Sequence, residues 1–232
     1  MDLIWEGICQ AFRLLFAGDP EVLAVALLSL KISGAATLVS LVLGLATGAF
    51  LALARFPGRR LCISIVNTGM GLPPVVVGLV VSILLWRSGP LGFLGILYTP
   101  LAMVVAQSLI ATPIVAGISL AAMGSLPEKL RLQILALGAS RLQLVALLVR
   151  EARLPLLAAA MAGFGGVISE IGASIMVGGN IRGQTRVLTT ATVMETSRGN
   201  FDIAIALSVI LLFLMLAVNA VLTWVQQQER RR

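Results

Sequence analysis

The residues best suited to bind a charged ligand lie in one glycine-rich stretch of the sequence, from Gly178 to Arg186. The stretch carries amide, guanidinium and hydroxyl groups, which belong to Asn180, Arg182, Gln184, Thr185 and Arg186. Such side chains, together with glycine-rich backbone N–H groups, suit an oxyanion or a negatively charged partner. The glycines have the spacing of a phosphate-binding P-loop, but Gln184 stands where the lysine belongs and no strand precedes it, which argues against ATP binding.

One acidic residue, Glu170, lies near the end of the apolar segment before this stretch. An ionisable group there is costly, so it is either functional or part of a structural pair at a helix end, with an arginine or a backbone N–H as its partner. The sequence has no histidine, which removes the usual general base, the HExxH zinc sites and the Ser-His and Cys-His pairs. Cys9 and Cys62 form no CxxC motif. The sequence therefore predicts no catalytic residue and no metal ligand.

The composition is that of an integral membrane protein. Of the 232 residues, 59% are hydrophobic and 12% are charged, whereas an ordinary globular domain is about 25% charged. A net charge of +7 could indicate nucleic-acid binding, but the basic residues lie between apolar segments and form no amphipathic basic face. The sequence therefore predicts a lipid environment and no nucleic-acid partner.

The apolar segments are long enough to be membrane spans, since a helix needs about 20 residues to cross a hydrocarbon layer of roughly 30 Å. Five segments qualify, over about residues 22–54, 63–86, 100–123, 155–177 and 203–225. Lys31 lies in the first, so we expect its amine to reach outward. Leu3–Phe16 is too short and too polar to cross, and predicts a surface helix. The expected parts are an interfacial helix at 1–21, a membrane domain at 22–225 and a tail at 226–232.

The distribution of Lys and Arg predicts the orientation. With five crossings, three basic groups holding 11 positive charges fall on one side, within residues 55–60, 129–153 and 230–232. Cytoplasmic loops retain positive charge, so the N-terminus is expected outside and the C-terminus in the cytoplasm.

The cytoplasmic interval 125–153 is expected to fold into two helices. Both Ser125–Glu128 and Ser140–Gln143 are capping-box patterns. Gly138 lies between them and suits a left-handed turn. The many leucines and alanines of this interval favour a docking surface over a solvated connector.

Prolines and small residues indicate where the spans bend and pack. Pro73-Pro74 and Pro113 are expected to kink or interrupt the second and third spans, either along a pathway or as ordinary bends. Small residues of the fourth span allow another backbone to approach closely, at Gly163, Gly165, Gly166, Gly172 and Ala173.

Over about residues 23–223 the sequence resembles the permease subunits of binding-protein-dependent ABC importers of the molybdate, sulfate and tungstate type. Leu137-Gly-Ala-Ser140 is similar to the glycine-centred turn of their cytoplasmic EAA loop. The stretch from Ser169 to Thr189 is similar to the glutamate-to-Gly-Asn-Ile stretch of molybdate permeases. Its continuation to Thr196 resembles the tungstate-uptake branch more closely.

The resemblance implies an all-α integral membrane protein with five transmembrane helices in a type I (MetI-like) ABC importer core and an EAA-type coupling helix pair. It implies a homodimer in a prokaryotic plasma membrane, a cytoplasmic ABC ATPase dimer that uses ATP, and an extracytoplasmic oxyanion-binding protein; this chain itself would bind no cofactor. The ATPase would dock on Leu137, Gly138, Ala139, Ser140, Arg141 and Leu142. The translocation path, its gate or the binding-protein docking surface would include Glu170, Asn180, Arg182, Gln184, Thr185 and Arg186.

Tungstate is the expected anion, with molybdate or sulfate as the alternative in the same class. A small ion channel is the alternative from another class, although a channel needs no leucine-rich cytoplasmic helix pair. An intramembrane enzyme is disfavoured, since the sequence has no GxSG motif with a histidine and no GxGD motif.

Overall fold

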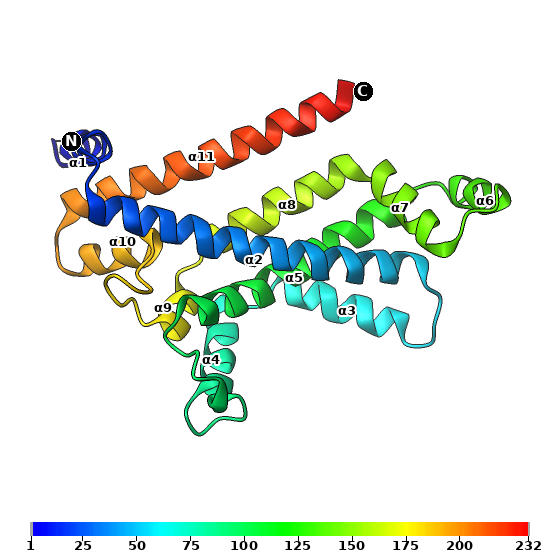
Figure 1. The fold of residues 1–232 in the computed structure, drawn as a ribbon, viewed down its shortest axis with the longest axis horizontal. Coiled ribbons are helices and arrows are strands. Elements are labelled where there is room, and N and C mark those ends of the chain that lie inside the picture. The colour runs from blue at the N-terminus through cyan, green and yellow to red at the C-terminus, as the bar shows by residue number, and fades with distance from the viewer. Residues whose placement is uncertain (1, 232) are drawn as a thin grey trace.

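The computed structural model describes residues 2–231, with the side chains of residues 4–14 and 17–228. Within residues 2–231 the chain forms eleven α-helices, one 3-10 turn and no β-strand. Three helices are long and apolar enough to cross a bilayer: α2 (Pro20–Leu53), α5 (Pro100–Gly124) and α11 (Phe201–Arg231). They lie along the long axis of the molecule, together with α8 (Arg153–Ile168) (Figure 1).

Two further apolar segments are broken. Helices α3 (Arg59–Met70) and α4 (Pro74–Leu85) meet at 102°, and α8 meets α9 (Gly172–Gly178) at 59°. Counting each bent pair as one span gives five spans in the described chain. The segments over 63–86 and 155–177, which the sequence presents as single apolar runs, are therefore bent rather than straight.

Prolines explain the break between α3 and α4, whereas the proline inside α5 does not interrupt that helix. Pro73 is extended, with φ −61° and ψ 123°, and Pro74 begins α4, because a residue before proline disfavours the helical conformation. Pro113 lies inside α5, which continues without interruption, so of the two outcomes expected there, a kink or an interruption, the interruption is wrong. A single proline removes one backbone hydrogen bond, and packed neighbours tolerate that loss in membrane helices.

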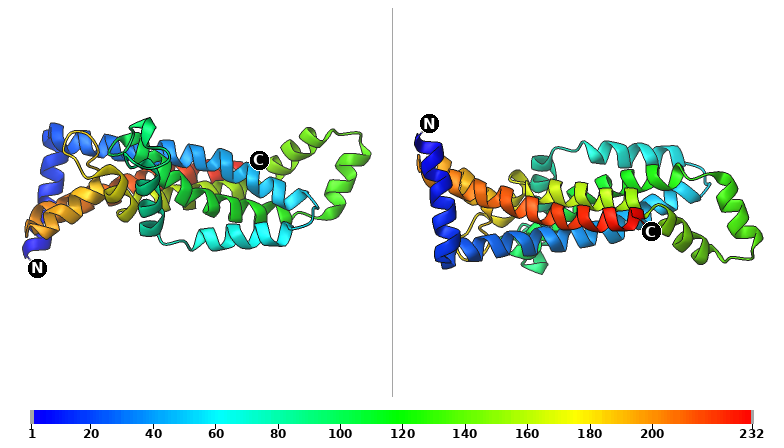
Figure 2. Two further views of the ribbon diagram at one scale, coloured as in Figure 1. Left: turned by 90° about the horizontal axis from the view of Figure 1, so that it is seen from below. Right: turned by 90° about the horizontal axis from the view of Figure 1, so that it is seen from above.

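Short helices close the two ends of the bundle. At one end, α1 (Asp2–Ala17) crosses the bundle axis (Figure 2) and packs on α11, where a Cβ at Gly7 would lie 2.5 Å from Ile205 Cγ2. Helix α10 (Leu188–Ser197) lies at the same end. At the other end lie α6 (Glu128–Ala136) and α7 (Arg141–Glu151). The 3-10 turn, η1 (Gly92–Leu94), follows α4.

The connection between α6 and α7 is built largely as the sequence predicts. Gly138 has φ +83°, and Ala139 N–H donates to the Ile134 carbonyl oxygen at 3.4 Å, as in a Schellman turn. The Ser140 capping box is formed: Ser140 Oγ accepts from Gln143 N–H at 3.3 Å, and Gln143 Oε1 accepts from Ser140 N–H at 2.8 Å.

The predicted capping box at Ser125 is wrong. Ser125 Oγ donates to the Ala122 carbonyl oxygen at 2.9 Å, so the hydroxyl serves the end of α5. Helix α6 begins at Glu128, after Pro127, and none of the described side chains caps its first turn.

Helices α2 and α5 approach closely through glycine. A Cβ at Gly48 would lie 2.7 Å from the Ala116 carbonyl oxygen, and one at Gly44 would lie 2.7 Å from Val115 Cβ. Ser40 Oγ of α2 also donates to the Ser108 carbonyl oxygen of α5, at 3.2 Å. In lipid, such close packing and interhelical hydrogen bonds hold helices together.

We expect Gly48→Ala to destabilise the protein, because the new methyl group would press on the backbone of α5. Overpacking of this kind costs about 1–3 kcal/mol. The matched control is Gly34→Ala in the same helix, where nothing lies within 4 Å of the position that the new methyl group would take. The measurement is the thermal unfolding midpoint of the detergent-purified protein; equal midpoints for the two variants would contradict the packing described here.

Candidate functional site

The glycine-rich stretch forms the loop between α9 and α10, and Thr185 holds this loop together. The Thr185 side chain is fully buried. Its Oγ1 donates to the Gly178 carbonyl oxygen at 2.5 Å and accepts from Ile181 N–H at 3.0 Å. Thr185 is therefore bonded within the loop and presents no free group to a ligand.

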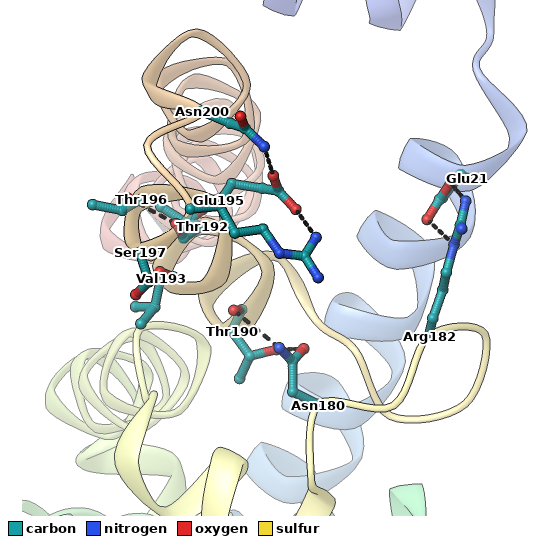
Figure 3. A network of polar contacts seen from close by, with 11 residues as sticks. Glu21, Asn180, Arg182, Thr190, Thr192, Val193, Glu195, Thr196, Ser197 and Asn200 are labelled. Carbon is teal, nitrogen blue, oxygen red and sulfur yellow. Dashed lines mark hydrogen bonds and ion pairs between the residues drawn. The ribbon is translucent and has the colours of Figure 1, made fainter.

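Asn180 fastens the loop to α10 (Figure 3). Its Oδ1 accepts from Thr190 Oγ1 at 2.9 Å, and its Nδ2 donates to the Thr190 carbonyl oxygen at 3.4 Å. The Asn180 backbone has φ +50°, a left-handed conformation that asparagine tolerates better than most residues.

Arg182 fastens the same loop to the start of α2. Its Nε donates to Glu21 Oε1 at 2.7 Å, and its Nη2 donates to Glu21 Oε2 (Figure 3). The hydrogen bonds that the Arg182 guanidinium donates to the Glu21 carboxylate raise the pKa of Arg182 above its ordinary value. Both side chains are exposed, so this pair contributes little to stability. Glu21 is a site residue that the sequence did not indicate, because its partner lies far away in the chain.

A second ion pair lies at the end of α10. Glu195 accepts from Arg198 Nη1 at 3.1 Å and from Asn200 Nδ2 at 2.7 Å, and Figure 3 shows Glu195 and Asn200 near the Asn180–Thr190 contact. Arg182 and Arg198 are thus both neutralised by carboxylates.

Arg186 lines two cavities at this end of the bundle. One, of about 330 Å³, also holds the two ion pairs in its wall. The other, of about 250 Å³, is lined by Lys31, Gln184 and apolar residues of α2. Arg186 Nε is buried and has no hydrogen-bond partner among the described residues. The smaller cavity therefore has two cations in its wall, and none of its described lining residues is acidic.

Lys31 is the second residue at this site whose position the sequence did not predict. Its side chain is exposed, and it lines the same cavity as Arg186 and Gln184. The signal that could have found it is its position inside an apolar span, since an intramembrane lysine is a functional candidate by default.

Glu170 lies apart from this cavity. Its side chain is only 8% exposed, and its Oε1 accepts from the N–H of Ala173 at 2.9 Å, in the first turn of α9. Of the partners considered from the sequence, the backbone donor is the one present, which is the arrangement of a structural cap at a helix break.

The predicted ATPase-docking residues lie at the opposite end, between α6 and α7. Leu137 is 89% exposed and Leu142 is 81% exposed. Gly138, Ser140 and Arg141 are exposed as well, and Ala139 is half-buried. The exposed leucines Leu137 and Leu142, on either side of the Gly138 turn, form an apolar tip. Such an exposed apolar surface is typical of a site that binds a partner protein.

Long apolar helices, two broken apolar segments and charged groups gathered at the two ends define a multi-pass membrane protein. The model of the family described as "Binding-protein-dependent transport system inner membrane component" matches residues 40–232. The chain belongs to this family, whose members are the permease subunits of ABC transporters.

Relatives are similar over nearly the whole chain. The tungstate uptake system permease protein TupB of Peptoclostridium acidaminophilum is 38% identical over 98% of this chain and 100% of its own length. A probable anion ABC transporter permease protein of Haloferax volcanii is 43% identical over 85% of this chain and 87% of its own.

The fold is also that of a solved permease. A methionine ABC transporter, MetNI, in inward-facing conformations, has a chain that matches with a TM-score of 0.74. The match covers 90% of this chain and 96% of that one, at 20% identity. The predicted fold class, an all-α membrane protein with a MetI-like core, is confirmed.

We expect Thr185→Val to loosen the loop between α9 and α10, because valine keeps the shape but leaves the buried Gly178 carbonyl oxygen and the part-buried Ile181 N–H without their partner. Each unsatisfied group costs about 1–3 kcal/mol. The measurement is hydrogen exchange over residues 179–187, which should become faster. Thr185→Ser is the control and should exchange as the wild type does; fast exchange in both variants would show that the hydroxyl is not what holds the loop.

Proposed function

We propose that this chain is the permease subunit of an ATP-driven, binding-protein-dependent oxyanion importer, and that its substrate is tungstate. The observation that carries the proposal is the 38% identity to a tungstate uptake permease over 98% of the chain. The substrate charge is supported independently by the smaller cavity at the α9–α10 loop, which Lys31 and Arg186 both line and which has no acidic residue among its described lining residues. Molybdate and sulfate are the alternative substrates, since both are tetrahedral oxyanions of the same charge.

In this proposal the loop end of the bundle faces outward and the α6–α7 end faces the cytoplasm. The basic residues within 55–60 and 129–153 then lie on the cytoplasmic side, which agrees with the positive-inside rule. The N-terminus is outside, α1 lies in the outer interface, and the C-terminus is inside.

Two copies of the chain would enclose one path, and a separate ATPase dimer would dock on the apolar tip of each copy. The chain itself would not hydrolyse ATP. ATP binding would close the ATPase subunits, move the tips and open the path outward; hydrolysis would reset the inward-facing state. An oxyanion delivered by a separate binding protein would first meet Arg186, whose buried Nε has no hydrogen-bond partner among the residues that the structure describes.

The proposal is tested by tungstate uptake into proteoliposomes that contain the chain, its ATPase and its binding protein. We expect tungstate uptake to require ATP and all three components. Molybdate and sulfate should inhibit this uptake, but more weakly than unlabelled tungstate does. Ion flux through the chain alone would instead support a channel, and stronger competition by molybdate or sulfate would reassign the substrate.

We expect Gly138→Pro to abolish co-purification of the ATPase while leaving the spans folded. Proline requires φ near −65° and has no N–H, whereas Gly138 has φ +83° and donates to the Leu135 carbonyl oxygen at 3.0 Å. Gly138→Asn is the matched control, because asparagine also adopts the left-handed conformation. An ATPase that still binds the proline variant would place the docking surface elsewhere.

We expect Arg186→Ala to lower uptake at least about tenfold, the loss expected for one hydrogen bond to a charged group. ATPase co-purification should remain, because Arg186 lies at the other end of the bundle. Arg87→Ala is the control: Arg87 is exposed and lines neither cavity of the loop. Unchanged uptake by the Arg186 variant would remove this residue from the anion's route.

A further inference from the structure

The largest cavity described lies at the α6–α7 end, between the last turns of α2 and the two short helices. Its volume is about 750 Å³. Its wall is mostly apolar, with Ala46 and Phe50 from α2 and Leu135 and Val145 from α6 and α7. The exposed tip residues Leu137 and Leu142 are not among the residues that line it.

Three arginines complete the lining, and none of the described lining residues is acidic. Arg131 Nη2 donates to the Leu53 carbonyl oxygen at 3.1 Å, which fixes it at the end of α2. Arg55 lies 3.3 Å from Glu128, but the two side chains are 87% and 73% exposed, so water competes with this pair. Arg141 is exposed and forms no hydrogen bond or ion pair within the described part of the chain. The cavity therefore keeps a net positive charge.

The apolar wall continues along α2 toward the middle of the bundle. Leu38, Val42, Ala46 and Phe50 follow one another at four-residue spacing, on one face of the helix. All four are exposed, Leu38 by 65% and Val42 by 70%. At 1.5 Å per residue this stripe is about 18 Å long, more than half of the roughly 30 Å hydrocarbon layer.

We propose that this cavity binds an anionic phospholipid, with the phosphate held by Arg55, Arg131 and Arg141 and an acyl chain along the stripe from Phe50 to Leu38. A basic cavity that opens onto an apolar helix face at the end of a span matches an anionic amphiphile in both charge and shape. A soluble oxyanion would use only the arginines and leave the stripe uncovered. The inference rests on the membrane-spanning fold and not on the transported substrate; the proposed orientation only decides which leaflet supplies the lipid.

The experiment is native mass spectrometry of the full chain, alone and with its ATPase, after addition of dioleoylphosphatidylglycerol or dioleoylphosphatidylcholine. The two lipids share acyl chains and differ in net charge. We expect the chain to retain phosphatidylglycerol preferentially in both samples. Arg141→Gln should weaken phosphatidylglycerol binding about fivefold, the effect of one basic residue near an anionic membrane surface.

Arg150→Gln is the matched control, because Arg150 is exposed on the same helix, α7, and does not line the cavity. Ala46→Phe fills the apolar wall without changing any charge, and should weaken binding of phosphatidylglycerol as well. Glycerol phosphate should fail to displace the lipid.

Four outcomes would overturn the proposal. Equal binding of the two lipids, or equal loss in the Arg141 and Arg150 variants, would mean that the cavity does not recognise the charge. Displacement by glycerol phosphate would make it a site for a soluble anion. Loss of the lipid from the complex with the ATPase would assign the cavity to that protein. None of these readouts depends on transport, so they remain informative if tungstate is not the substrate.

Discussion

The structure depends on one constraint, that backbone N–H and C=O groups within the hydrocarbon layer must find partners in the chain itself. Helices α2, α5 and α11 meet it by running without interruption. The two breaks meet it locally: between α3 and α4, Gly71 N–H donates to the Thr68 carbonyl oxygen at 3.1 Å and Leu72 N–H to that of Gly69 at 3.3 Å. Between α8 and α9, the Glu170 carboxylate accepts from Ala173 N–H, and the Glu170 carbonyl oxygen accepts from Thr189 Oγ1 at 3.2 Å. Glu170 thus supplies two of the hydrogen-bond acceptors that close this break.

The two breaks also support each other. Helices α4 and α9 are short, yet they pack so closely that a Cβ at Gly78 would lie 2.6 Å from Ala173 Cα. A Cβ at Gly172 would likewise lie 2.7 Å from Val75 Cγ2. Small residues let two backbones approach until dispersion contacts hold them, which is the main source of helix association in lipid. The small-residue run of the fourth span is therefore used unevenly, since a Cβ at Gly165 would meet no atom within 4 Å.

Features that depend on neighbouring residues were predictable from the sequence, and features that depend on distant ones were not. The Ser140 capping box and the left-handed Gly138 depend on a few consecutive residues. The capping box predicted at Ser125 was wrong because one hydroxyl can bond either to the helix before it or to the helix after it, and the sequence does not say which. The predicted loop residues do share one loop. However, the sequence did not predict that Asn180 and Thr185 would form hydrogen bonds within the loop and to α10. Arg182 bonds to Glu21, and Arg186 lines the same cavity as Lys31. Each pair consists of residues more than 150 positions apart, which no local pattern encodes.

Helix α2 connects the two polar ends of the molecule. Its 34 residues span about 51 Å at 1.5 Å per residue. Arg182 bonds to its first turn through Glu21, and Arg131 donates to the carbonyl oxygen of its last residue, Leu53. If an ATPase moves the α6–α7 tip, as we propose, the displacement would reach α2 through Arg131 and then the α9–α10 loop through Glu21. These attachments are polar and partly exposed, so each can break and form again at little cost. The contact of α2 with α5 through Gly44 and Gly48 leaves no such freedom. We therefore expect α2 and α5 to move together as one rigid unit. The change in geometry should be confined to the segments bonded to the two ends of α2, which are the α9–α10 loop and the α6–α7 segment.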